Sequence, residues 1–410
     1  MKHFPLILTA LWLTLSCVNE RVEPSLPETR RNILFYIATD EGSIIDGDTK
    51  PKIDDIRRGW QPGKGEMLIY ADRLNNGATL MRISDVKGSN GAYMIDTLAN
   101  YGVENSADPA TLSRAIDSLT RHHKADSYGL IFFSHASGWL PKGMLANPRS
   151  LVIDKGGDGV KKEMNYTDFA DAIPDHTFDF IILEACLMAD VISMYELRNK
   201  ADYILASSAE IVAPGFQLGL TWDNVLPPSA YQTKTMSLFD TQQPVETILK
   251  DFGQAYYNIV SKISAGNDYN SMTLGLIKMS EMDALATATK TALNGAVIHE
   301  NSLKTGVDIN DIQTFDRPQA SGMGGMPYSR YFDFAHTLQN IVPQDKYADF
   351  SKQMEKTVVW KVSTPNFMLS YNGFEIKHHC GLTTYIERET VYPDITAAYE
   401  QSAWFAATQN

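Results

Sequence analysis

One cysteine and one histidine in this chain each follow a short apolar stretch of the kind that forms a buried strand. Cys186 comes shortly after Phe180–Leu183, and His135 comes shortly after Tyr128–Phe133. If the two strands are neighbours in a parallel sheet, their carboxyl ends meet at one edge, where ligands of open α/β sheets bind. A thiol beside an imidazole is what a cysteine nucleophile with a general base requires. The spacing therefore predicts hydrolysis through a thioester.

The residues after Cys186 have helical periodicity. Apolar side chains recur from Met188 to Leu197 at the spacing of one helix face. We therefore expect the thiol on a strand-to-helix turn, where the positive end of a helix favours the thiolate. On these residues alone, Cys186 could instead be a buried structural cysteine, and His135 a histidine that caps a strand end.

The composition is that of a folded protein without a nucleic-acid partner. The chain has 410 residues, enough for two domains or one enlarged domain, with 44% hydrophobic and 21% charged residues. The formal net charge of −13 comes without any basic stripe, which argues against nucleic acid as the main partner. No internal repeat or low-complexity tract is present.

The amino terminus is typical of an export signal. Lys2 precedes the apolar run Phe4–Leu15, which is too short to span a bilayer, and Ser16 and Cys17 follow. Residues 1–17 therefore predict a lipoprotein signal peptide, with lipidation at Cys17. Residues 18–31 would be a tether, and the protein would be anchored in the cell envelope, facing the periplasm or the cell surface. Thr14 stands where an aliphatic residue is usual, so plain secretion remains an alternative.

Neither a disulfide nor a metal is expected in the mature chain. Cys186 and Cys380 could pair in an exported protein, but Cys380 is better explained as a small buried residue. Asp40, Asp46 and Asp48 could bind calcium, although their spacing matches no calcium loop. We therefore expect no cofactor, with calcium as the alternative.

Strands alternate with helices over residues 32–240, which predicts a mostly parallel sheet covered on both faces. Residues 241–410 are mostly helical, with strands that could join the sheet, while Asp40–Arg58 is expected to be a polar loop. Strands are predicted at 32–38, 66–70, 78–83, 128–133, 151–153, 180–183, 203–207, 272–277 and 381–386, and helices at 109–122, 166–173, 188–197, 245–263, 282–293, 332–341, 347–359 and 395–408.

The motifs around the histidine and the cysteine resemble one peptidase family. The pattern is His135-x-x-Gly-Trp139, then E-A-C-L-M around Cys186, then Y-E-L and A-D-Y, and finally Pro-Gly after a Ser/Ala-rich strand end. This order is similar to that of the clostripain family of cysteine peptidases, whose relatives include gingipains, legumains and caspases. The likeness is strong over residues 30–225 and weaker beyond. It implies a caspase-like αβα sandwich, with His135 as general base and Cys186 as nucleophile.

The resemblance also implies cleavage after Arg or Lys, with an acidic residue in the specificity pocket. Glu184 stands where the family usually has Asp, and Glu210 is the one acid kept in the loop before Pro214-Gly215. Both are candidates for binding a basic side chain, in a pocket narrower or less acidic than usual. Alternatively, Glu184 is a structural hydrogen-bond acceptor and Glu210 is solvated.

Backbone amides must stabilise the oxyanion of an acyl-transfer intermediate. Ala136 and Gly138, together with the amide of Cys186, are the candidates, because Gly138 allows an unusual backbone turn. Some members of the family mature by cleavage between the histidine and the cysteine. Basic residues in this interval are candidate cleavage sites, unless they form a solvated loop: Lys142, Arg149, Lys155, Lys161 and Lys162.

Together these features predict an exported, lipid-anchored cysteine endopeptidase that acts on protein or peptide substrates. Two alternatives use the same cleft. One is a catalytically inactive surface binding protein, and the other is a cysteine-dependent transpeptidase.

Overall fold

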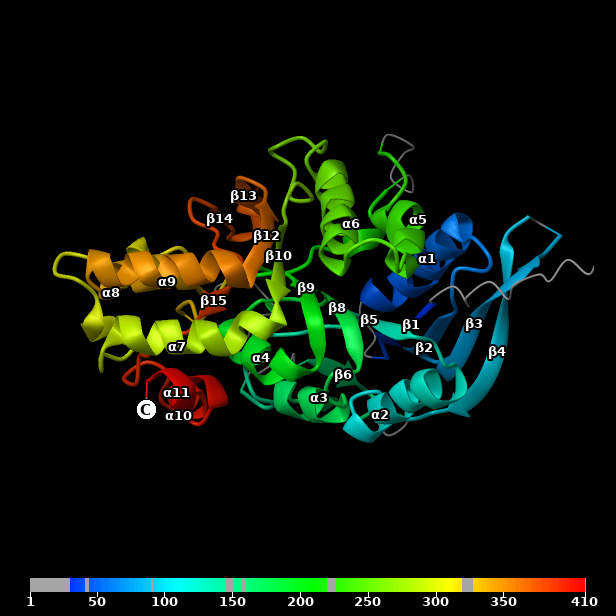
Figure 1. Ribbon diagram of the computed structural model, residues 1–410, viewed down its shortest axis with the longest axis horizontal. Helices are drawn as coiled ribbons and strands as arrows, with labels where there is room; N and C mark the ends of the chain where they lie inside the picture. The colour runs from blue at the N-terminus through cyan, green and yellow to red at the C-terminus, as the bar shows by residue number, and fades with distance from the viewer. Residues whose placement is uncertain are drawn as a thin grey trace, which may run out of the picture.

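The computed structural model describes residues 30–40, 44–89, 91–144, 151–156, 159–219, 226–318 and 327–409. The strands of its central sheet are β1 (Arg31–Ala38), β2 (Met67–Arg73), β3 (Gly77–Lys87), β4 (Tyr93–Gly102), β5 (Ser127–Phe133), β8 (Phe178–Glu184), β9 (Ala201–Ala206), β10 (Thr273–Lys278) and β12 (Val358–Ser363). Their order is β12-β10-β9-β8-β5-β1-β2-β3-β4 (Figure 1). The strands from β9 to β2 run parallel, whereas β10 and β3 join them antiparallel. The predicted mostly parallel sheet is confirmed.

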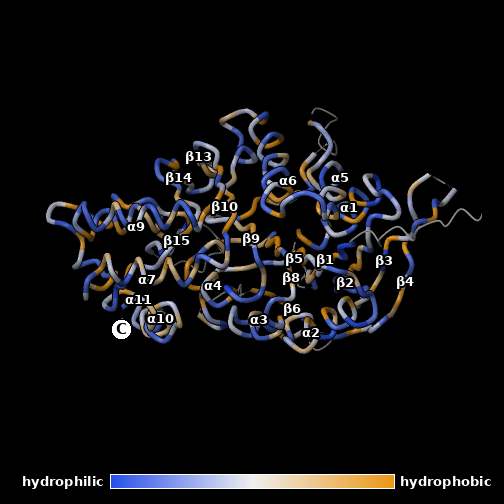
Figure 2. The backbone as a smooth tube through the Cα atoms, viewed as in Figure 1, coloured by the Kyte–Doolittle hydropathy of each residue, from blue (hydrophilic) through white to orange (hydrophobic). Residues whose placement is uncertain are grey.

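Helices cover both faces of this sheet, as Figure 1 shows. One layer contains α1 (Ile44–Gly59), α5 (Ala230–Lys234) and α6 (Val245–Val260), and the other contains α2 (Pro109–Asp117), α3 (Tyr166–Ala172) and α4 (Val191–Glu196). Alternate residues of β1 enter two separate cores, with Leu34 and Tyr36 in one and Ile33 and Phe35 in the other. Apolar residues concentrate along the central strands in Figure 2. Burial on both faces explains why these strands are continuous apolar runs.

The C-terminal region extends the sheet at one end. It supplies β10 and β12 and a group of helices beside them (Figure 1). These helices are α7 (Met282–Leu293), α8 (Phe334–Ile341), α9 (Gln344–Thr357), α10 (Pro393–Glu400) and α11 (Ala403–Thr408). Short strands pair outside the sheet: β6 (Val152–Asp154) with β7 (Lys162–Met164), β11 (Phe332–Asp333) with β15 (Thr383–Thr384), and β13 (Asn366–Phe367) with β14 (Phe374–Glu375).

Several elements differ from the prediction, among them α1, β4 and β12, and the helix expected at 395–408 is divided into α10 and α11. The expected loop Asp40–Arg58 is mostly helix α1, which buries Ile45, Ile53 and Ile56 on one face. The helix contains Pro51 and many charged residues, and for this reason its periodicity was not recognised in the sequence. The edge strand β4 was also not predicted, because much of it is exposed and its apolar residues do not alternate cleanly.

The predicted signal peptide, Cys17 and most of the tether lie outside the described residues, as does Arg149. Within the described part of the chain, none of the helices combines the length and apolar character needed to traverse a bilayer. Cys186 and Cys380 are not joined to each other by a disulfide. Cys380 is buried, and its thiol donates to the carbonyl of Leu382 at 3.0 Å, so its expected role as a small buried residue agrees with its surroundings.

Candidate active site

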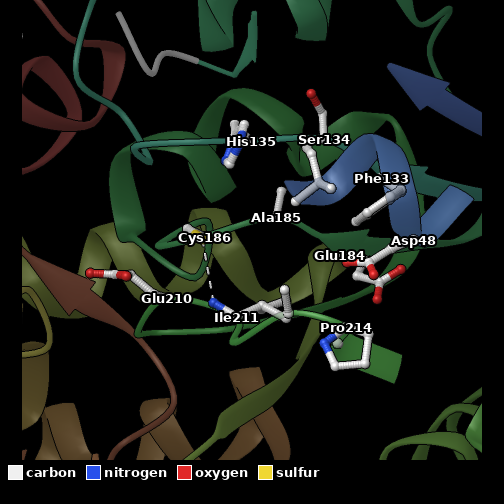
Figure 3. A pocket seen from close by; sticks show the side chains of 13 residues that line it. Asp48, Phe133, Ser134, His135, Glu184, Ala185, Cys186, Glu210, Ile211 and Pro214 are labelled. Carbon is white, nitrogen blue, oxygen red and sulfur yellow. Dashed lines mark hydrogen bonds between the residues drawn. The ribbon is translucent and has the colours of Figure 1, made fainter. Parts of the chain in front are cut away.

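A cleft of about 270 Å³ lies at the carboxyl ends of β5 and β8, and both His135 and Cys186 line it (Figure 3). The two strands are adjacent and parallel, with Phe133 opposite Glu184. The residues that follow each strand therefore emerge at the same edge of the sheet. The structure brings together the imidazole and the thiol that the sequence places far apart. The lining residues are Ile45, Asp48, Phe133, Ser134, His135, Glu184, Ala185, Cys186, Glu210, Ile211, Ala213, Pro214 and Gly215.

The chain around Cys186 is held by the segment that follows β9. The backbone N–H of Ile211 donates to the sulfur of Cys186 at 3.3 Å, and the N–H of Leu187 donates to the carbonyl of Ala209 at 2.9 Å. Leu187 has a φ of 62°, a left-handed conformation that costs a non-glycine residue roughly 1–3 kcal/mol. The partly exposed thiol therefore sits on a backbone turn that its neighbours hold in place.

The helix expected directly after the thiol begins later, at Val191. Ala189 instead pairs with the segment after β9, donating its N–H to the carbonyl of Ser207 at 2.9 Å. The first turn of α4 is capped by Asp190, whose carboxylate accepts from the N–H of Ser193 at 2.7 Å. The prediction that a helix amino end adjoins Cys186 is therefore wrong, because extended pairing separates the two and a carboxylate occupies the helix end.

The loop after His135 packs tightly against the loop after Cys186. Gly138 has a φ of 57°, and a Cβ at this position would come within 2.6 Å of the carbonyl oxygen of Leu187. The hydroxyl of Tyr331 donates to the carbonyl of Ser137. Only glycine satisfies both the close approach and the left-handed backbone. Among the described residues that line the cleft, neither Ala136 nor Gly138 appears, so their predicted oxyanion role stays a prediction.

The carboxylate of Glu184 is paired inside the protein. Its Oε1 lies 2.7 Å from Nζ of Lys52, and neither side chain is exposed at all. The hydroxyl of Tyr231 donates to Oε2 at 2.5 Å, and the N–H of Phe216 donates to Oε1 at 2.8 Å. Burial raises the pKa of Glu184, whereas Lys52 and the two donors act in the opposite direction. These contacts favour the structural alternative for Glu184 over a contact with the substrate.

Lys52 was not singled out from the sequence. Its ammonium group also donates to the carbonyl of Pro214 at 2.6 Å and lies 4.2 Å from the centroid of the Phe133 ring. It comes from α1, the helix that the sequence did not reveal. The same helix supplies Asp48, a half-buried carboxylate of the cleft wall whose pKa is raised by burial and lowered by Lys52.

Glu210 also has a partner within the protein. Its two oxygens accept from Nη2 and Nε of Arg317 at 2.6 and 3.2 Å, a two-point ion pair that is largely buried. Nη1 of Arg317 donates in addition to the carbonyl of Tyr371 at 2.8 Å. In Figure 3, Asp48 and Glu184 lie together at one end of the cleft and Glu210 lies at the other. The solvated alternative for Glu210 is therefore wrong.

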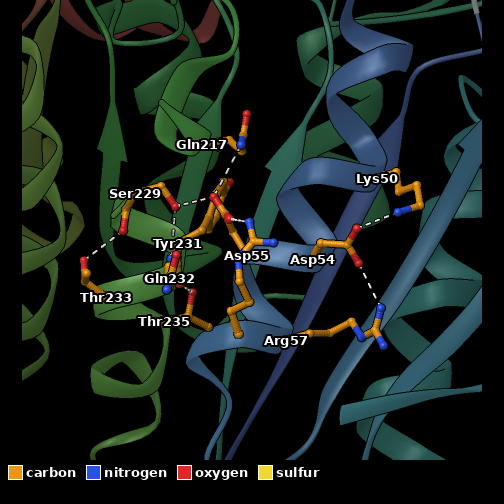
Figure 4. Close-up of polar contacts among 11 residues, drawn as sticks. Lys50, Asp54, Asp55, Arg57, Gln217, Ser229, Tyr231, Gln232, Thr233 and Thr235 are labelled. Carbon is orange, nitrogen blue, oxygen red and sulfur yellow. Dashed lines mark hydrogen bonds and ion pairs between the residues drawn. The ribbon is translucent and has the colours of Figure 1, made fainter. Parts of the chain in front are cut away.

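A polar network fixes helix α1, and with it Asp48 and Lys52, against α5 (Figure 4). The carboxylate of Asp55 accepts from the hydroxyl of Ser229, which caps α5, and pairs with Arg58 on its own helix. Gln217 donates to the same carboxylate at 3.4 Å. Because Asp55 is almost fully buried, these contacts fix α1 to α5 and to the segment of Gln217 within their common layer.

The three acids considered for calcium separate in the structure. Asp46 pairs with Arg73 at 3.4 Å, and Asp48 lines the cleft. Asp40 instead lies with Asp72 and Asp154 in a different cluster. Of the candidate cleavage sites, Lys142, Lys155, Lys161 and Lys162 are described, and Lys162 begins β7.

Comparison with known proteins identifies the family of this chain. The family model described as "Clostripain family" matches residues 36–400. No curated protein sequence matches. One similar solved structure is a secreted C11 cysteine protease from Bacteroides thetaiotaomicron in complex with an irreversible peptide inhibitor. It is 26% identical, with a TM-score of 0.73, over 92% of this chain and 98% of that one.

A second similar structure is an inactive zymogen of a C11 protease from Parabacteroides distasonis. It has 24% identity and a TM-score of 0.72, over 94% of this chain and 100% of that one. At this identity the match supports the fold, which is the caspase-like sandwich expected from the sequence. Because the family model spans nearly the whole chain, the protein belongs to the clostripain family of cysteine peptidases.

Proposed function

We propose that this protein is an endopeptidase that uses Cys186 as nucleophile and His135 as general base. The observation that carries the proposal is that both side chains line one open cleft at the carboxyl edge of the sheet. His135 takes the proton of the thiol, and the sulfur attacks the carbonyl carbon of the peptide bond. His135 then gives the proton to the leaving amine, and the thioester remains. A water molecule, deprotonated by His135, hydrolyses the thioester and releases the acid and the thiol.

Alkylation kinetics test this assignment directly. Iodoacetamide is expected to modify Cys186 of the native protein faster than in a urea-denatured control at pH 6 to 7, because an imidazole partner promotes thiolate formation. His135→Ala should remove the difference, whereas Cys380 should react only after denaturation. Mass spectrometry of the peptides gives each rate. A native Cys186 that reacts no faster than the denatured thiol would favour the alternative of a non-enzymatic binding protein.

The charges of the cleft wall support a preference for Arg or Lys before the scissile bond. The wall contains three carboxylates, and the pairs with Lys52 and Arg317 neutralise Glu184 and Glu210. Within the described part of the chain, Asp48 forms no ion pair, so it carries the remaining negative charge. We propose that Asp48, rather than Glu184 or Glu210, contacts the cationic side chain of the substrate.

Asp48→Asn should therefore change the substrate specificity of the protein more than its folding stability. We expect kcat/KM for substrates with Arg or Lys before the cut to fall about 10- to 100-fold, the effect of losing a charge-assisted contact of about 1.5–3 kcal/mol. Matched peptide amides with Arg or Gln at that position measure the ratio. Asp46→Asn is the control, because Asp46 lies on the same helix but pairs with Arg73. An unchanged Arg-to-Gln ratio in Asp48→Asn would exclude the assignment.

We also propose that the protein is exported, with residues 1–17 as signal peptide and Cys17 as the lipidated residue. The apolar run that ends before Ser16-Cys17 supports this proposal. Palmitate labelling in cells should modify the wild-type chain and spare Cys17→Ser. Labelling of neither form would leave plain secretion as the explanation, provided that the protein is found in the medium.

A further inference from the structure

We propose that Glu210 and Arg317 are positioning residues of the nucleophile, because their ion pair holds the backbone N–H of Ile211 on the sulfur of Cys186. The inference rests on the function proposed above for Cys186. The N–H donates to the sulfur at 3.3 Å, and a dashed line marks this contact in Figure 3. Such a hydrogen bond is stronger to a thiolate than to a thiol, so it favours the form that attacks the peptide bond.

The surroundings of the thiol explain why a backbone donor matters there. Helix α4 begins only at Val191, and its first turn is capped by the carboxylate of Asp190, so the positive end of a helix does not adjoin the sulfur. Among the described residues of the cleft lining, His135 alone can carry positive charge. The other titratable side chains of the lining, apart from the thiol, are acids: Asp48, Glu184 and Glu210.

The donating N–H belongs to the peptide group that joins Glu210 to Ile211. The residue before this peptide group is fixed on both sides. The N–H of Ala209 donates to Oγ1 of Thr273 at 2.9 Å, and its carbonyl accepts from the N–H of Leu187 at 2.9 Å. The side chain of Glu210 is the next attachment point along the chain. Its orientation therefore limits how far the peptide group can turn away from the sulfur.

Arg317 holds that side chain from the C-terminal region. Its Nη2 and Nε donate to the two oxygens of Glu210 at 2.6 and 3.2 Å, and the two side chains are only 9% and 15% exposed. A two-point contact of this kind fixes the planes of both groups. The guanidinium is itself anchored, since Nη1 donates to the carbonyl of Tyr371 at 2.8 Å and the preceding residue, Asp316, forms a fully buried ion pair with Arg330.

The C-terminal region thus contributes to the reactivity of a thiol that lies on the central sheet. Loss of Arg317 alone would have two effects. It would free the peptide group, and it would leave the carboxylate of Glu210 as an uncompensated negative charge that repels the thiolate. Loss of both members of the pair leaves the summed charge unchanged, so the double variant Glu210→Gln, Arg317→Gln isolates the positioning effect.

The pH dependence of alkylation measures this effect on the sulfur itself. The full-length double variant is treated with iodoacetamide, and mass spectrometry gives the rate at Cys186. The pH of half-maximal rate should rise by about one unit relative to the wild type, the consequence of losing one hydrogen bond to a charged group. Arg317→Gln should shift it further because of the added repulsion. Arg317→Lys should shift it less, since an ammonium group retains the charge but loses the two-point contact.

Other groups near the thiol do not imitate such a shift. The thiol and His135 titrate as a pair in every variant. Burial raises the pKa of Asp190 to about 7, and this too is common to all variants. His379, which contacts the hydroxyl of Ser208 at 3.4 Å, has a pKa lowered by burial to about 3, so it stays uncharged between pH 5 and 9.

Steady-state kinetics separate positioning from substrate binding. With a fluorogenic peptide amide at pH 6 to 7, the double variant should lose about tenfold in kcat while KM changes less than about twofold. A rise in KM with unchanged kcat and an unchanged alkylation profile would mean that Glu210 contacts substrate, and it would overturn the positioning role.

The pair of Glu300 with Arg388 provides a matched control. Its side chains are 28% and 12% exposed, its atoms meet at 3.0 Å, and neither residue is among the described residues that line the cleft. Glu300→Gln combined with Arg388→Gln should lower the free energy of unfolding in urea but leave the alkylation profile of Cys186 unchanged. An equal shift in this control would mean general loosening of the fold and would overturn the proposal.

The outcomes also distinguish this inference from the proposed function. A wild-type Cys186 that reacts no faster than the denatured thiol contradicts the peptidase mechanism, and the positioning role falls with it. An activated wild-type thiol whose profile and kcat are unchanged in the double variant overturns the positioning role alone. If the double variant does not fold, Arg317→Lys decides, and an unchanged profile in that variant overturns the proposal.

Discussion

Replacing Cys186 with alanine is expected to abolish hydrolysis of peptide amides while the fold stays intact. The change removes the sulfur that forms the thioester in the proposed mechanism, so kcat/KM should fall by about 10⁴-fold or more. The sulfur is partly exposed and accepts a hydrogen bond from the N–H of Ile211, so alanine can replace it without leaving a fully buried cavity. Initial rates with a fluorogenic peptide amide measure the activity, and circular dichroism checks the fold.

The second described cysteine provides a matched control. Cys380 is buried away from the cleft lining, so Cys380→Ala should retain activity although it loses some stability. His135→Ala should reduce activity to a similar extent, and the double variant with Cys186→Ala should be no worse than either single variant, because the two residues act as one unit. Retention of activity in Cys186→Ala, or its loss in Cys380→Ala alone, would contradict the assignment of the nucleophile.

Lys52→Met is expected to destabilise the protein by about 3–5 kcal/mol, the cost of leaving one member of a buried ion pair without its partner. In the native protein neither Lys52 nor Glu184 has an exposed side chain, so the change leaves the buried carboxylate of Glu184 without its cation. It also removes the hydrogen bond to the carbonyl of Pro214 and the contact with the Phe133 ring. Urea denaturation measures the free energy of unfolding. Lys52→Met combined with Glu184→Gln should recover part of the loss, because no buried charge then remains.

Lys50 on the same helix is the matched control. It pairs with Asp54 at 2.6 Å, but its side chain is 74% exposed, so Lys50→Met should change the free energy of unfolding by less than about 1 kcal/mol. Both substitutions place methionine in α1 and remove one positive charge. If Lys52→Met lowers the free energy of unfolding by no more than Lys50→Met does, the buried ion pair does not stabilise the protein as the structure implies. Glu184 would then again be a candidate for binding substrate.

Local pattern was enough to predict the central part of the fold. The apolar runs that became β1, β5 and β8 are continuous because helices cover the sheet on both sides. The motifs that follow two of these runs predicted which family the chain belongs to. The same reasoning missed α1, because its buried face is spread over widely spaced isoleucines within a charged, proline-containing segment.

The partners of the acids could not be predicted from the chain order. Glu184 was considered as a substrate contact, but Lys52 reaches it from a helix far away in the sequence. Glu210 likewise meets Arg317 from the C-terminal region. Whether a carboxylate contacts substrate or an internal cation depends on which distant segment packs against it. The local sequence pattern around the carboxylate does not contain this information.

The sequence by itself determined the central strands, the positions of the thiol and the imidazole at strand ends, and the family, because these depend on residue types at short spacing. Only the tertiary structure decided which charges remain available in the cleft and which acids gather at the end of β1. Ion pairs and carboxylate clusters are set by Coulomb interactions and burial between segments that meet only after folding, and so they become visible only in three dimensions.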